Sequence, residues 1–139
     1  RGPIENYADR KLSQNVGIYK QTADEQFYPY IRPQETGTKS DIRWWKQTND
    51  SGFGFRIVSP ELFSASALHY SIADLDEGLE KAQRHSPQVP KSKYTELCID
   101  LGQTGVGGVN SWSKEAIALP SYRLPYKQYT FTFMLVPQK

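Results

Sequence analysis

Alternating apolar and polar positions run through most of the chain and predict β-strands. In the clearest run, from 126 to 136, the apolar side is formed by Tyr129, Phe131, Phe133 and Leu135. This alternation is typical of an antiparallel sheet with one packed face and one wetter face. Weaker strand patterns occupy 16–22, 41–48, 53–58, 65–70, 96–101 and 116–119. Turn sequences separate the strands at 35–37, 49–52, 59–60 and 102–108.

One segment has the spacing of a helix. Ser71 is followed three residues later by Asp74, which makes a capping-box start, and apolar residues recur at 72, 75, 79 and 82. The pattern predicts a helix over 72–84, ended by Pro87 and Pro90 because proline donates no backbone hydrogen bond. One helix among about seven strands predicts a mainly β fold, an antiparallel β-sandwich of two stacked sheets.

Length and charge restrict the possible classes of protein. The 139 residues contain no internal repeat or composition shift, which predicts a single domain over 1–139. With 17 basic against 15 acidic residues, the net charge of +2 is too small for a nucleic-acid-binding stripe. No apolar run approaches the roughly 20 residues of a membrane span. The first residue is Arg1 rather than Met, so we expect the chain to be cut from something longer.

Metal and nucleotide sites have little support in the sequence. The two histidines lack the close spacing of a zinc motif, and we expect His69, inside a predicted strand, to be a hydrogen-bonded structural residue. Cys98 cannot form an internal disulfide, and its setting predicts a buried small hydrophobe. The run GVGGVN has Asn110 where a dinucleotide-binding loop needs its third glycine, and no helix pattern follows.

The acidic residues do not single out a catalytic pair. A retaining glycosidase needs two carboxyl groups about 5 to 5.5 Å apart, which sequence spacing alone does not reveal. Three acids, Glu5, Glu35 and Asp100, lie near turns or strand ends, where we expect caps and surface ion pairs.

The tryptophans are more informative. Trp112 directly follows GVGGVNS, so a glycine-rich bend presents a large ring whose face suits the apolar side of a sugar. Asn110 and Ser111 would then hydrogen-bond the sugar hydroxyls. The alternative is that Trp112 plugs the end of the sandwich. Because Trp44 and Trp45 are adjacent in a strand, they must point to opposite faces, one into the core.

The chain resembles the C-terminal β-sandwich domain of bacterial β-galactosidases of glycoside hydrolase family 2. Motifs that carry the resemblance occur in the family's order and cover nearly the whole chain: GPIENYADR at 2–10, YPYIRPQETG at 28–37, DIRWW at 41–45, FSASALHYS at 63–71, DLD at 74–76, IDLGQTGVGGVNSW at 99–112 and YRLPY at 122–126. The resemblance implies a galactose-mutarotase-like supersandwich, of which this chain would be the C-terminal portion.

The family also implies an activity and where its chemistry lies. The parent enzyme would hydrolyse terminal β-D-galactosides, such as lactose, with retention, using two glutamates in a separate (β/α) barrel. Because such a barrel takes about 250 residues, this chain would hold no catalytic residue and would be inactive alone. Magnesium and sodium or potassium ions belong mostly to the family's other domains, so none is expected here. The compartment would be bacterial cytoplasm or periplasm.

One role transfers to named residues. By resemblance, Trp112 would stack on the leaving-group sugar, called the aglycone, such as the glucose of lactose, in the active site of the barrel. Gly105, Gly107 and Gly108 would shape its loop. Partners would be the remainder of the parent enzyme, the barrel above all, and the galactoside or glucose.

Two departures from the family pattern and one rival hypothesis remain open. Val109 stands where the family commonly has an acidic residue, and Thr36 replaces a common asparagine in the PQETG turn. The rival hypothesis is a stand-alone carbohydrate-binding module, in which Trp112 and the outward-facing tryptophan of the 44–45 pair form a sugar platform. We also expect a truncated chain to expose unpaired sheet edges and to self-associate.

Overall fold

The computed structural model describes residues 1–30, 35–76, 78–79, 84–108, 110 and 113–139. Within them, four strands form one antiparallel sheet: β1 (Lys39–Thr48), β2 (Gly54–Leu68), β3 (Glu96–Asp100) and β4 (Met134–Gln138). The described residues also form two α-helices of a single turn each, α1 (Ala23–Gln26) and α2 (Ile72–Leu75). They contain four 3-10 turns: η1 (Lys11–Ser13), η2 (Ser86–Gln88), η3 (Lys114–Ala116) and η4 (Pro120–Tyr122). The mainly β, antiparallel prediction is confirmed, and the sheet is consistent with a β-sandwich-like fold.

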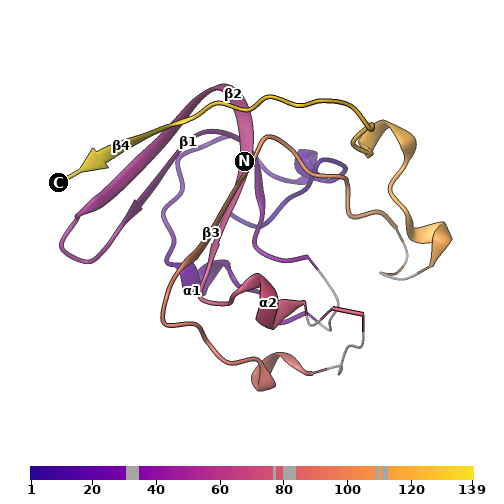
Figure 1. The fold of residues 1–139 in the computed structure, drawn as a ribbon, viewed down its shortest axis with the longest axis horizontal. Helices are drawn as coiled ribbons and strands as arrows, with labels where there is room; N and C mark the ends of the chain where they lie inside the picture. Colours follow the sequence, from indigo (N-terminus) through magenta and orange to yellow (C-terminus); the bar gives the residue numbers. More distant parts are fainter. Residues whose placement is uncertain (31–34, 77, 80–83, 109, 111–112) are drawn as a thin grey trace.

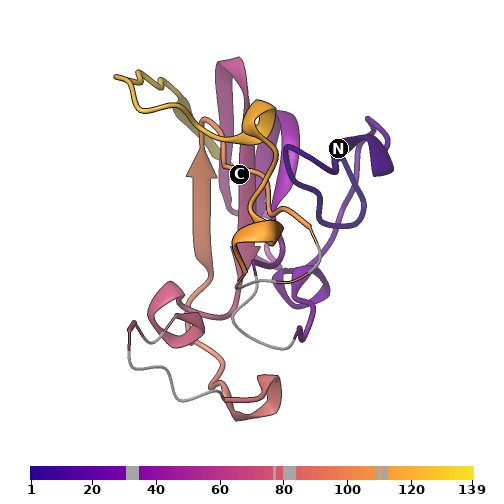
Figure 2. The ribbon, with the colours of Figure 1, turned by 90° about the vertical axis from the view of Figure 1, so that its right-hand side faces the viewer.

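Strand β2 is the centre of the sheet (Figure 1). β1 runs antiparallel along one edge of β2, from the pair Thr48↔Gly54 to the pair Lys39↔Ala65. The other edge is shared: β4 pairs with the first part of β2, and β3 pairs with its last part, Ser64 to Leu68. The N-terminal segment and the loops after β3 gather at the end of the sheet away from the β1–β2 turn (Figures 1 and 2).

The core lies between β1, β2 and β3. Its buried members are Ile42, Ile57, Phe63 and Ala65, and Trp45, Phe55, Leu97, Ile99 and Phe131 pack against them. Trp44 points to the opposite face, where it is 38% exposed and the Arg56 guanidinium lies 4.7 Å from the ring centroid. The prediction that the two adjacent tryptophans divide between core and surface is therefore confirmed.

The predicted turn at 59–60 is wrong, because the single strand β2 runs through it and contains most of the strands predicted at 53–58 and 65–70. Pro60 lies where the register against β1 shifts, between the pair Trp44↔Val58 and the pair Ile42↔Phe63. It also lies between the parts of β2 that pair with β4 and with β3. A proline is tolerated at such an irregularity because no ladder hydrogen bond needs its missing N–H.

Three other strand predictions need correction. The C-terminal strand begins only at Met134, and Leu135 is 59% exposed, so the predicted packed face is limited to Phe131. The segment 16–22 is not a strand, and its side chains at Val16 and Ile18 are exposed. The segment 116–119 contains the end of a 3-10 turn instead, with no partner strand in the described residues.

The helix starts where the sequence predicts and is much shorter than 72–84. The Ser71 hydroxyl accepts a hydrogen bond from the backbone N–H of Asp74 at 3.0 Å, which confirms the N-cap half of the predicted capping box. α2 ends at Leu75 because Asp76 is extended and Gly78 adopts a left-handed conformation with φ of 85°. Positions 77 and 80–83 of the predicted helix lie outside the described residues. None of the described helices has the length and apolar character needed to cross a membrane.

Candidate functional site

The N-terminal segment, residues 1–15, joins parts of the chain that are far apart in the sequence. The Glu5 carboxylate accepts hydrogen bonds from the Gly37 N–H at 2.7 Å and the Thr36 hydroxyl at 3.4 Å, both in the PQETG turn. Asn6 is 1% exposed, and its amide oxygen accepts from the Ser40 N–H at 3.2 Å. Glu5 therefore caps a turn, as the sequence predicts for it.

Ion pairs also join the N-terminal segment to the start of β1. The Asp41 carboxylate lies 2.8 Å from Arg1 Nε and 3.0 Å from Lys11 Nζ. Although partial burial opposes ionisation of Asp41, its hydrogen bonds to Arg1 and Lys11 give the carboxyl a lowered pKa. Arg1 and Lys11, toward the two ends of the N-terminal segment, are thus both held at Asp41 of the sheet.

Between those ends, Asp9 and Arg10 hold the glycine loop, which we define as residues 102–108. The Asp9 carboxylate accepts hydrogen bonds from the Gly107 N–H at 2.8 Å and the Val106 N–H at 3.3 Å. The Arg10 guanidinium donates to the Gly107 carbonyl. Both backbone polar groups of Gly107 are therefore held by neighbouring side chains of the N-terminal segment.

Two of the predicted loop glycines lie against other atoms of the chain. At Gly107, φ is 80° and an added Cβ would stand 1.8 Å from the Ala116 carbonyl oxygen. At Gly105, an added Cβ would stand 2.7 Å from the Asp9 carboxyl group. Gly108 differs, since its nearest contacts would be 3.9 Å away. Geometry therefore requires glycine at 107, where backbone atoms and the positive φ exclude a side chain, whereas a side chain at 105 would have to displace Asp9.

Two backbone hydrogen bonds join the glycine loop to the chain that follows it. The Gly108 N–H donates to the Ala116 carbonyl at 2.9 Å, and the Gly105 N–H donates to the Tyr122 carbonyl at 2.8 Å. Within this closed segment, the Asn110 amide oxygen accepts from the Ser113 N–H at 2.7 Å and its nitrogen donates to the Ser113 hydroxyl at 3.0 Å. Of the residues predicted to contact sugar, Asn110 is described, whereas Ser111 and Trp112 lie outside the described residues. Their ligand-binding roles stay predictions.

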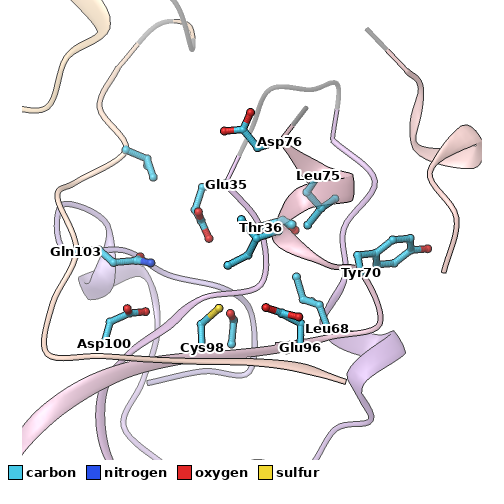
Figure 3. Close-up of a pocket in the computed structure, with 13 residues that line it drawn as sticks. Glu35, Thr36, Leu68, Tyr70, Leu75, Asp76, Glu96, Cys98, Asp100 and Gln103 are labelled. Carbon is cyan, nitrogen blue, oxygen red and sulfur yellow. The ribbon is translucent and has the colours of Figure 1, made fainter. Parts of the chain in front are cut away.

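A pocket of about 520 Å³ opens beside the glycine loop. Figure 3 shows Glu35 pointing into it from the PQETG turn and Asp100, Cys98 and Glu96 facing it from β3. The glycine loop contributes Gln103 and Val106 to the wall. The pocket thus has a carboxylate-rich lining with no basic residue among the described ones.

Burial in the pocket wall favours the neutral form of its acids. Burial raises the pKa of both Glu35 and Asp100. At Glu35, a hydrogen bond that the Thr38 hydroxyl donates at 3.1 Å partly offsets this rise. Burial raises the pKa of the Cys98 thiol as well, so the thiol is a poor nucleophile. Cys98 is half-buried at a pocket rather than in the core, which corrects its predicted position.

Metal ligation has no geometric basis in the described part of the chain, where no three His, Cys, Asp or Glu side chains come together as a metal site. His69 follows the end of β2, and its Nδ1 atom lies 2.8 Å from the Asp24 carboxylate. The predicted hydrogen bonding of this histidine is confirmed, whereas its predicted place inside a strand is wrong because β2 ends at Leu68.

Sequence reasoning gave no role to Asp9 and Arg10. They belong to the GPIENYADR motif, but their partner Gly107 lies 98 positions after Asp9. The only signal in the sequence was the presence of both motifs, which does not reveal that they touch.

Comparisons with known proteins agree on one family. A family model described as "Beta galactosidase small chain" matches residues 1–135. A β-galactosidase of Priestia megaterium is 41% identical over 138 residues, which is 99% of this chain. β-Galactosidases of Bifidobacterium adolescentis and Vibrio cholerae are 38% and 32% identical over 91% and 95% of the chain. The chain spans only 12–13% of the length of these relatives.

Proposed function

Because the chain belongs to the β-galactosidase small-chain family, we propose that it is part of a larger enzyme that hydrolyses terminal non-reducing β-D-galactosides. Its task there is to complete the aglycone side of the active site and to support the catalytic barrel. Residues 1–139 form the C-terminal portion of the last β-sandwich domain. The two catalytic glutamates of the retaining mechanism belong to the barrel, outside this chain.

The size of the relatives supports this division of labour. Since the chain matches about one eighth of their length, the rest leaves ample room for a barrel of about 250 residues. Glu35 and Asp100, two of the acids that line the pocket, have pKa values that burial raises. They lie on the PQETG turn and on strand β3. We assign them no catalytic role. Magnesium and alkali-metal ions are likewise assigned to the remainder of the enzyme.

The bracing of the glycine loop is the observation that carries the proposal. Gly107 is held by Asp9 and Arg10 on one side, and Gly108 is held by Ala116 on the other. A ring presented by such a loop meets a sugar without first losing much conformational freedom, which favours binding. Trp112 would hold the aglycone against the reacting centre, which increases the time that a leaving or accepting sugar spends there.

The proposal is tested by Trp112→Ala in the complete polypeptide that contains this chain. Transfer of galactose from a nitrophenyl galactoside to added glucose should need up to about tenfold more glucose, because a ring stacking contact contributes roughly 0.5 to 1.5 kcal/mol and 1.4 kcal/mol is about tenfold. Hydrolysis of the nitrophenyl galactoside should change far less, and the isolated chain should show no turnover. An unchanged dependence on glucose would contradict the proposed role.

A stand-alone carbohydrate-binding module is not favoured. The relatives that cover this chain are β-galactosidases about eight times as long. Trp44, the outward-facing tryptophan of that hypothesis, has Arg56 lying over its ring, so part of the proposed sugar platform is already covered.

A further inference from the structure

We propose that Asp9 is a positioning residue for aglycone binding, because its carboxylate fixes the loop that leads to Trp112. The inference rests on the proposed function of Trp112 given above. Two successive backbone N–H groups, from Val106 and Gly107, point at the one carboxylate of Asp9. Successive N–H groups of this kind form a concave anion-binding site, here filled by a side chain of the protein itself.

Packing and hydrogen bonding restrict the loop at the same place. The Asp9 carboxyl group occupies the space beside Gly105, where an added Cβ would stand only 2.7 Å from it. Arg10, the next residue, donates to the Gly107 carbonyl, so the peptide groups on both sides of Gly107 are held. The loop cannot move relative to the N-terminal segment without breaking these contacts together.

Displacement at Gly107 would pass directly to the closed segment that follows. Gly107 lies five residues before Trp112, and its neighbour Gly108 donates the hydrogen bond to Ala116 that closes the segment. A shift of about 1 Å in a group that orients a substrate is enough to lower a rate by roughly a hundredfold. The Asp9 carboxylate therefore acts on the acceptor sugar through the loop, without touching the sugar.

The decisive variant is Asp9→Asn in the complete polypeptide. Asparagine keeps the size of the side chain but replaces one acceptor oxygen by an NH₂ group, which cannot accept from a backbone N–H. With a nitrophenyl galactoside as donor and glucose as acceptor, the glucose concentration for half-maximal transfer should rise about tenfold, because the loss of one charge-assisted hydrogen bond leaves the aligned loop only about a tenth populated. Hydrolysis of the nitrophenyl galactoside in water should fall by a clearly smaller factor than transfer to glucose.

A matched control is Glu25→Gln at α1, where a carboxylate also accepts a backbone hydrogen bond, from Thr22 at 2.7 Å. This variant should leave the glucose dependence unchanged. Arg10→Met removes only the donor to the Gly107 carbonyl and should shift the glucose dependence in the same direction by a smaller factor. If Asp9→Asn fails to fold, the Arg10→Met result decides the question.

Trp112→Ala, measured in parallel, separates the two hypotheses. If that variant weakens glucose transfer while Asp9→Asn and Arg10→Met do not, the positioning role of Asp9 is wrong and the proposed function stands. If Asp9→Asn lowers hydrolysis and transfer by the same factor, its role is general support of the fold and the inference is overturned. An unchanged glucose dependence in Trp112→Ala removes the proposed function and this inference with it.

Discussion

Lys39 at the start of β1 should make the stability of the chain rise with pH in the alkaline range. The residue is 7% exposed, and within the described part of the chain its ammonium group donates to two neutral acceptors, the Gly37 carbonyl at 3.1 Å and the Gln26 amide at 3.5 Å. Burial lowers its pKa from 10.5 to about 8, although nearby Glu5 acts in the opposite direction.

The magnitude follows from the two pKa values. The difference between a pKa of 10.5 in the unfolded chain and about 8 in the folded chain corresponds to about 3 kcal/mol in the free energy of unfolding. Because the folded pKa is depressed, this stability is fully present above pH 10.5 and is lost as the pH falls through about 8. Lys39→Met removes the charge and keeps the length of the side chain, at a cost of about 1 kcal/mol for the lost hydrogen bonds.

The expected result is a change of sign with pH. At pH 7 the Lys39→Met variant should be more stable than the wild type by about 2 kcal/mol, and at pH 10.5 less stable by about 1 kcal/mol. Urea unfolding followed by tryptophan fluorescence measures both values, and tyrosine ionisation affects the two proteins alike. Lys46→Met, on the exposed part of the same strand, is the control and should show no such reversal. A stability difference that stays constant between pH 7 and pH 10.5 would refute the reasoning.

Two further predictions concern the glycine loop and the sheet edges. Gly107→Ala should lower the free energy of unfolding by at least about 1 to 2 kcal/mol, because the left-handed conformation is strained for alanine and the new Cβ meets the Ala116 carbonyl. Gly108→Ala should be tolerated, and equal losses of stability in urea unfolding of the two variants would contradict this prediction. The outer edges of β1, β3 and β4 have no partner strand among the described residues, so the isolated chain should self-associate. Sedimentation that shows only monomer at every concentration would count against the second expectation.

Local features of the fold were readable from the sequence. The Ser71 cap depends on residues three positions apart, and the division of Trp44 and Trp45 follows from the alternation of any strand. The C-terminal alternation was misleading, because it predicts a packed face but does not reveal whether another layer covers it. Leu135 has the pattern of a buried residue and is 59% exposed.

Features that depend on distant partners were not readable. Pro60 is compatible with a strand only because the register of β1 shifts beside it, and that shift is a property of the assembled sheet. The site divides in the same way. Motif order led to the glycine loop and Trp112, whereas the contact of Asp9 with Gly107 joins positions with no local relation.

The link between Asp9 and Gly107 also has a consequence for the order of folding. It closes a stretch of 98 residues, and contacts of such wide sequence separation form late because the chain must first lose the entropy of a large loop. During synthesis, Asp9 leaves the ribosome long before its partner does. The sheet pairing of β1 with β2 can precede the link, so the glycine loop should acquire its final shape only after the sheet is in place.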